Sequence, residues 1–181
     1  MTGTAGRAAV AEILAERARA LAVPLHSAEP ADTVDLVVLA IGPEWYGLDT
    51  RFVLEVQPLV GLARVPGLPS VWAGVANVRG TLRPVLDLRH YLGLPAGPQP
   101  PGAGSGRKVS LVSDAGLTVG LLVDDAVEIR RVPAALIGPP LVGPTSAARR
   151  QIRGVTPDLL TVLDVAGLLA DLRLVVREEP T

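Results

Sequence analysis

The sequence predicts a mainly β protein, built as small antiparallel barrels or as a sandwich. Short apolar segments recur from residue 34 to residue 163, several with the alternation typical of a strand that has a buried face. The chain has 19 glycines and 17 prolines, many of them at turns between these segments. Apolar residues make up 49% of the chain but aromatic residues only 3%, so the core must be aliphatic, and its many valines favour strands.

The first 33 residues predict an amphipathic helix followed by a linker. Residues 8–22 carry an apolar stripe at helical spacing, and Pro24 ends the pattern. The residues of this stripe are Val10, Ile13, Leu14 and Leu21. A helix this short, with a narrow and alanine-rich stripe, is marginal alone, so we expect it to need a surface to lie on. Residues 24–33 have no periodicity and indicate a polar linker.

The rest of the chain predicts strands with two short helices. The stretch "TRFVLEVQPLVGLARVP", residues 50–66, is expected to begin as a short helix or a strand that carries Glu55. The other expected strands are 36–41, 45–48, a segment ending near Val65 and Pro66, the two flanks of Arg79 and Gly80, three pieces within 107–133, and strands near 151–155 and 159–163. Helical spacing occurs in 88–92 and 164–172. Proline-rich and glycine-rich stretches at 96–106 and 138–150 indicate loops.

The stretch "GVANVRGTLRPVLDL" places Arg79 and Gly80 between two strand-like segments. We expect Gly80 to adopt a positive φ at a hairpin corner, since glycine reaches that region without steric cost. The planar head of Arg79, with its five donors, suits a carboxylate partner at that corner. The alternative is an ordinary turn with a solvated arginine.

Charge and composition argue against several classes of protein. The 17 basic and 18 acidic residues give a net charge of -1, so a general attraction to nucleic acid or to anionic lipid is not expected. The sequence has no cysteine and only two histidines, His26 and His90, which excludes a disulfide framework and a Cys/His zinc cluster. No apolar run approaches the roughly 18 residues of a membrane span, and residues 8–22 are too charged for a secretory signal. We therefore expect a soluble protein of the cytoplasm.

No set of residues indicates catalysis or a bound cofactor. The glycine-rich segment before Arg107 leads into a strand, so it lacks the helix amino terminus of a phosphate site. Both histidines are expected to be solvated. Asp124 and Asp125 are neighbours in a strand and should point to opposite faces, with one carboxylate solvated. The arginine pairs at 130–131 and 149–150 are expected to be solvated strand and loop ends. The sequence thus favours a binding module over an enzyme.

The order of several motifs resembles the CheW family of chemotaxis coupling proteins. These motifs are "YGLD", "VLEVQPL", "RVPGLPSVWAGVANVRGTLRPVLDLRHYLGLP", "VGLLVDDAVEI" and a last strand running into "LDVAGLL". Together they cover residues 34–172, and the combination in this order is specific although each motif alone is weak.

The resemblance implies a fold of two intertwined five-stranded SH3-like β-barrels with an aliphatic core between them and a short C-terminal helix. The CheW-like domain would then span residues 34–172, with its second barrel formed mainly by about 80–155. Residues 1–33 would be an added helix and linker, and residues 173–181 a tail.

The resemblance also implies a non-enzymatic adaptor without a cofactor. Such a protein docks the regulatory domain of a CheA-type histidine kinase and the cytoplasmic tip of a methyl-accepting chemoreceptor, at receptor arrays on the inner face of the membrane. The implied partner-binding residues are Val53, Glu55, Asn77, Arg79 and Gly80. Arg79 would be held at the hairpin corner by Glu55.

The sequence departs from the family pattern in three places. Asp125 stands where the family usually has glycine, the loop at 96–106 is long, and the helix at 8–22 is an addition seen in some relatives. Two alternatives stay open at this point. One is a CheW-like scaffold of another kinase pathway, such as surface motility or gene regulation. The other is a small-barrel RNA-binding protein, although the chain lacks the basic surface and clustered aromatics that such a protein needs.

Overall fold

The computed structural model describes residues 32–95, 106–139 and 151–171. The predicted helix at 8–22, the tail at 173–181 and the arginine pair at 149–150 lie outside the described residues. The strands are β1 (Thr33–Ile41), β2 (Glu44–Asp49), β3 (Val53–Pro58), β4 (Trp72–Val78), β5 (Thr81–Asp87), β6 (Lys108–Asp114), β7 (Leu117–Val123), β8 (Asp125–Pro133), β9 (Ile152–Val155) and β10 (Thr161–Leu163). The helices within these ranges are α2 (Leu88–Tyr91) and α3 (Val165–Leu169), with 3-10 turns η1 (Thr50–Phe52) and η2 (Ala134–Leu136).

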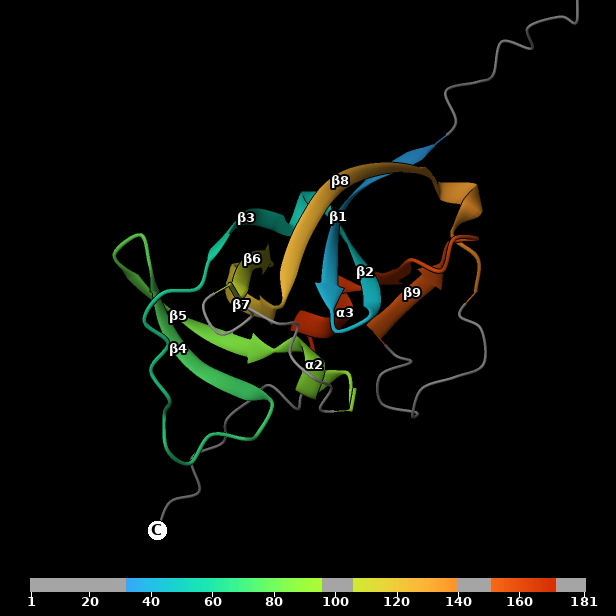
Figure 1. Ribbon diagram of the computed structural model, residues 1–181. Helices are drawn as coiled ribbons and strands as arrows, with labels where there is room; N and C mark the ends of the chain where they lie inside the picture. The colour runs from blue at the N-terminus through green and yellow to red at the C-terminus, as the bar shows by residue number, and fades with distance from the viewer. Residues whose placement is uncertain (1–31, 96–105, 140–150, 172–181) are drawn as a thin grey trace, which may run out of the picture. The chain divides into compact units, whose positions relative to one another are not determined.

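The strands form two five-stranded sheets (Figure 1). Sheet A has the order β8-β1-β2-β10-β9, and sheet B has the order β3-β6-β7-β5-β4. Both sheets are mixed, because β10 runs parallel to β2 and β7 runs parallel to β5. The mainly β prediction is confirmed, but the antiparallel prediction is wrong for one strand pair in each sheet. Each parallel pair joins strands that are far apart in the sequence, which alternation within a segment does not reveal.

The two sheets are nested along the chain. Sheet B uses the consecutive strands β3 to β7, whereas sheet A combines β1 and β2 with β8, β9 and β10. The whole of sheet B is thus inserted between the two parts of sheet A. The range of about 80–155, expected for the second barrel, contains β5 to β7 of sheet B together with β8 and β9 of sheet A.

Among the described residues the core has three parts, and the largest lies between the two sheets. Strand β1 shows why, since its successive side chains alternate between faces. Val37, Leu39 and Ile41 enter the shared core between the sheets. Leu36 and Val38 enter a smaller core inside sheet A. Sheet B encloses its own small cluster of Ala76, Val85, Val109 and Leu122.

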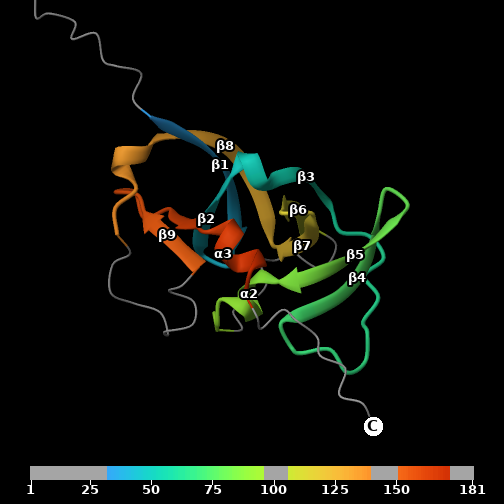
Figure 2. The same cartoon turned by 180° about the vertical axis from the view of Figure 1, so that it is seen from behind.

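Both short helices follow a strand directly and are capped by an aspartate. Asp87 accepts a hydrogen bond from the backbone N–H of His90 (3.1 Å), and Asp164 accepts one from Gly167 (3.0 Å). Their apolar sides fill the shared core, with Leu88 and Leu168 fully buried. The two helices lie close together in both views (Figures 1 and 2). The helical spacing read from the sequence is confirmed at both places.

The predicted strand that ends near Val65 is wrong. Residues 59–66 have no strand and touch β4 through one bridge, between Ala63 and Val75. Pro58 ends β3, and proline cannot donate to a further ladder bond. Beside the bridge, Gly74 has a φ of 141° and a β-carbon there would lie 2.1 Å from the carbonyl oxygen of Ala63. The close approach therefore requires glycine and interrupts regular pairing.

Candidate partner-binding surface

The β4–β5 turn consists of Arg79 and Gly80, which follow the last paired residues, Val78 and Thr81. Both have positive φ, 49° for Arg79 and 83° for Gly80, as a two-residue type I′ hairpin requires. The predicted positive φ of Gly80 is confirmed. The same geometry at Arg79 was not anticipated, because the turn type and not the residue preference sets its φ.

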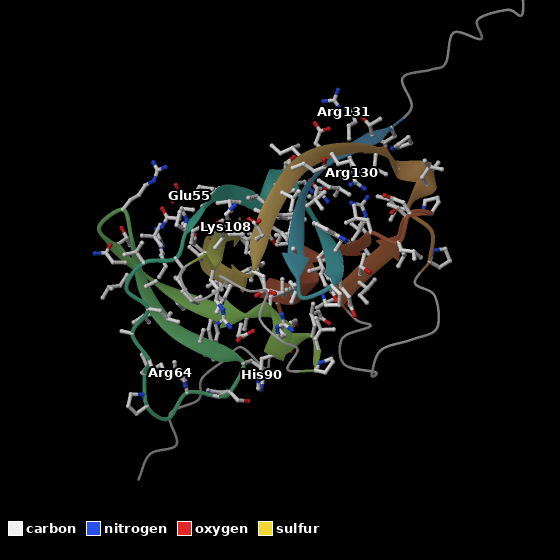
Figure 3. The ribbon with its side chains drawn as sticks, in the orientation of Figure 1. Glu55, Arg64, His90, Lys108, Arg130 and Arg131 are labelled. Atoms are coloured by element: carbon white, nitrogen blue, oxygen red, sulfur yellow. The ribbon has the colours of Figure 1, made fainter. Side chains whose placement is uncertain are left out.

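The expected ion pair between Arg79 and Glu55 is present. The Nη2 atom of Arg79 lies 2.6 Å from the Oε2 atom of Glu55. The arginine side chain is 78% exposed, whereas the glutamate is 19% exposed. Glu55 lies on β3 and Arg79 follows β4, which are the two edge strands of sheet B. The ion pair therefore joins the two edges of sheet B, and Figure 3 shows Glu55 close to the β4–β5 turn.

Sheet A is closed in a comparable way. Its edge strands are β8 and β9, and the chain that follows β8 returns through η2 to pair with β9. Gly138 and Val155 exchange two backbone hydrogen bonds there, of 3.0 and 2.9 Å. A β-carbon on Gly154 would lie 2.4 Å from the carbonyl oxygen of Gly138, so the closure depends on a glycine in β9.

A groove of 460 Å³ runs between β3 and β8, beside the Arg79–Glu55 pair. Its lining residues are Thr50, Val53, Leu54, Glu55 and Val56 of η1 and β3, Ala126, Val127, Glu128 and Ile129 of β8, and Val37 of β1, which pairs with Ile129. Three of the apolar side chains face solvent, with exposures of 62% for Leu54, 52% for Val127 and 71% for Ile129. Neighbouring exposed apolar side chains in a groove are typical of an interaction site.

The structure brings only some of the predicted site residues together. Val53 and Glu55 line the groove, and Arg79 reaches Glu55 from the hairpin turn. Gly80 shapes that turn, and Asn77 is exposed on β4, so neither lines the groove. Sequence reasoning missed Leu54, Val127 and Ile129. Their apolar character is visible in the sequence, but their exposure follows from the position of β3 and β8 at sheet edges.

Charged residues on β8 form exposed ion pairs. Arg131 contacts Asp35 through two nitrogens, at 2.7 and 2.9 Å, and this contact lowers the pKa of Asp35. Arg130 contacts Glu128 and Asp158, each at 2.5 Å. Both arginines lie within β8 and are exposed to solvent, as the sequence predicted, but their pairing with carboxylates was not predicted (Figure 3).

The neighbours Asp124 and Asp125 face opposite environments, as predicted. Asp124 is nearly buried and lies 2.6 Å from the Nη2 atom of Arg89. Asp125 is half-exposed, and its carboxylate lies 2.5 Å from the ammonium nitrogen of Lys108. Sequence reasoning found neither partner. Arg89 and Asp124 are 35 residues apart in the sequence, and no local pattern indicates that they become neighbours.

The described residues hold no group of three or more histidine, cysteine or acidic side chains arranged to bind a metal ion. Within the same ranges, no helix has the length and apolar character needed to cross a membrane.

Comparisons with known proteins identify this arrangement of strands. Residues 35–173 match the family model of the CheW-like domain. The chain belongs to the CheW-like domain family. A probable chemotaxis protein CheW of Rhizobium etli is 29% identical over 123 residues, which cover 67% of this chain and 76% of that protein. Chemotaxis protein CheW of Bacillus subtilis is 26% identical over 137 residues, covering 74% and 85%.

A solved structure agrees with the sequence comparisons. The scaffolding protein TtCheW of Thermoanaerobacter tengcongensis matches with a TM-score of 0.62 and 27% identity, over 72% of this chain and 88% of that one. The family consists of non-enzymatic scaffold proteins. The protein is accordingly a CheW-like scaffold of chemotaxis signalling, and the two five-stranded mixed sheets are the CheW fold.

Proposed function

We propose that this protein couples a CheA-type histidine kinase, held through the kinase's regulatory domain, to the cytoplasmic tip of a chemoreceptor. We further propose that the receptor tip binds to the groove between β3 and β8 and to the Arg79–Glu55 pair at its side. The observation that carries this proposal is the exposed apolar lining of the groove, Leu54, Val127 and Ile129, next to an exposed ion pair.

The chemistry of the groove supports a protein partner. Burial of apolar surface is the main favourable term in most protein–protein association. The charged residues at its sides, Glu55 and Glu128, would select the orientation of the partner. Family membership supports the identity of the two partners, and the closed edges of sheets A and B support an SH3-like barrel for each sheet.

Arg79 is the residue through which the proposal is best tested. A partner that covers the turn removes water from the ion pair, so a charge left without its counterpart costs about 2–5 kcal/mol of binding free energy. Arg79→Glu places a second carboxylate beside Glu55. We expect a folded variant whose affinity for a receptor fragment falls by about 30-fold or more, while much of its affinity for the kinase regulatory domain remains.

The matched control is Arg153→Glu. Arg153 lies on β9 and contacts Asp49 at 3.5 Å, so its reversal also sets two carboxylates side by side, but away from the groove. Both variants are titrated separately against a receptor fragment and a kinase regulatory domain. Unchanged receptor binding by Arg79→Glu, within the error of the control, would reject the assignment.

Asn77 and Gly80 have lesser roles in this proposal. Gly80 holds the turn in the shape that directs Arg79 toward Glu55, and Asn77 offers an exposed side chain on β4. The proposal also implies a cytoplasmic location at receptor arrays on the inner face of the membrane. Affinity capture from the native cell would identify the bound kinase and so decide between chemotaxis and another pathway that uses the same parts.

A further inference from the structure

Lys108 makes a contact between the two sheets. It is the only lysine among the 17 basic residues of the sequence. It begins β6 in sheet B, and its ammonium nitrogen lies 2.5 Å from a carboxylate oxygen of Asp125 and 3.2 Å from the carbonyl oxygen of Ala126. Asp125 and Ala126 begin β8 in sheet A. Figure 3 shows Lys108 near Glu55 and below β3.

This contact lies at one end of the partner groove. The walls of the groove belong to different sheets, β3 to sheet B and β8 to sheet A. Lys108 pairs with Pro58 at the end of β3, and its ammonium group bonds to Ala126, a lining residue. The side chain therefore connects the β3 wall to the start of the β8 wall.

We propose that Lys108 and Asp125 form a clamp that fixes the distance between the β3 and β8 walls and thereby tunes the groove for its partner. The first half of this proposal concerns the geometry of the free protein, and the second half rests on the proposed function of the groove.

The residue types suit a clamp. A lysine ammonium is compact and has three donors, so it can bond a carboxylate and a carbonyl oxygen together, whereas the planar fork of arginine suits a single carboxylate. Asp125 is itself fixed, because its carboxylate accepts a hydrogen bond from the N–H of Ala126 (2.7 Å). The hydrogen bond from Lys108 also lowers the pKa of Asp125 below its ordinary value.

Because the pair is exposed, its role is to position the groove walls and not to stabilise the fold. The Lys108 side chain is 33% exposed and the Asp125 side chain 55% exposed, and ion pairs in such positions add little to folding stability. A glycine at position 125 would have no carboxylate to hold Lys108, so Asp125→Gly removes the contact at its acidic end.

Spin labels can measure the distance between the walls directly. The chain has no cysteine, so Leu54→Cys together with Ile129→Cys gives one label on each wall. Electron–electron distance measurements on the free protein then compare the parent with Lys108→Met and with Asp125→Gly. Arg131→Met is the control, because it breaks an ion pair of β8 whose partner, Asp35, lies in the same sheet.

We expect a broader or longer distance distribution in Lys108→Met and in Asp125→Gly, and an unchanged one in Arg131→Met. Exchange of the charges, Lys108→Asp with Asp125→Lys, should narrow the distribution again. Unchanged distributions in both clamp variants would overturn the clamp.

Unlabelled clamp variants should also bind a receptor fragment about 3- to 10-fold more weakly at an unchanged melting temperature. A broadened distribution with unchanged receptor affinity would leave the clamp standing and reject its tuning of receptor binding, while receptor binding by Arg79→Glu separately tests the groove as the receptor site.

Discussion

Two arginine–carboxylate pairs in this protein have the same length and different surroundings. Arg89 and Asp124 lie 2.6 Å apart, as do Arg79 and Glu55. The first pair is 18% and 8% exposed, and it lies where α2 meets the connection between β7 and β8. The second pair has an arginine that is 78% exposed. Equal distances therefore say little about energy, because the surrounding solvent decides what each pair contributes.

The buried pair connects three parts of the chain. Asp124 accepts a hydrogen bond from the N–H of Gly42 in the β1–β2 turn (2.6 Å) as well as from Arg89. Arg89 also donates to the carbonyl oxygen of Pro95 (3.3 Å). Loss of one member leaves the other buried without a counter-charge. The exposed pair has water as a ready substitute, so its members remain available to a partner.

The largest effect is expected from Asp124→Ala, which breaks the buried pair. We expect a loss of about 3–5 kcal/mol in the free energy of unfolding, since Arg89 and the N–H of Gly42 both lose their acceptor. Urea unfolding measures this loss. Asp114→Ala, at the less buried β6–β7 turn, serves as the control. A loss for Asp124→Ala no greater than that of the control would remove the distinction between the two pairs.

A smaller effect is expected from Gly80→Ala, which strains the β4–β5 turn that carries Arg79 of the exposed pair. An added β-carbon meets no atom within 4 Å, so the cost comes from the positive φ alone, about 1 kcal/mol. Gly80→Asn is the matched variant, because asparagine tolerates this region better than alanine and should lose less. Equal stability of parent and alanine variant in urea unfolding would contradict the turn geometry.

The exposed pair itself should matter still less for folding. Arg79→Ala is expected to change the free energy of unfolding by no more than about 1 kcal/mol. Thermal and urea unfolding of this variant, measured beside Asp124→Ala, compare the two pairs directly. A loss as large as that of Asp124→Ala would show that exposure does not separate them.

The smallest effect is expected from acid titration of the exposed pair between Asp35 and Arg131. The hydrogen bond from Arg131 lowers the pKa of Asp35 below its ordinary value of 3.8. A lowered pKa means that the pair's contribution is present above about pH 3.8 and is lost as the pH falls through the lower folded value. Asp35→Asn should flatten this part of the stability curve, measured by urea unfolding from about pH 5 downward. An unchanged acid slope in that variant would reject the contribution.

Local patterns predicted the local structure of the fold. Alternation located β1, β2 and β5, and the Arg-Gly pair predicted the hairpin corner and the positive φ of Gly80. Helical spacing predicted α2 and α3. These features depend on neighbouring residues, which a single sequence displays.

The remaining features depend on which strands become neighbours in space. The pair of Arg89 with Asp124 and the contact of Lys108 with Asp125 both join separate strands or helices. Leu54 and Ile129 are apolar like any core residue, and only the edge positions of β3 and β8 expose them. The candidate site could be predicted at its hairpin and at Glu55, but not along the β8 wall.

The insertion of sheet B into sheet A sets an order of events during synthesis. Strand β2 ends at Asp49, and β8, the next strand of sheet A along the chain, begins at Asp125. At roughly 5–20 residues per second, a ribosome needs on the order of 4–15 s to make the intervening chain. All five strands of sheet B are synthesised during that interval, whereas β1 and β2 must wait for their remaining partners. The partner groove, which needs β8 as one wall, is therefore completed only after every strand of sheet B has been made.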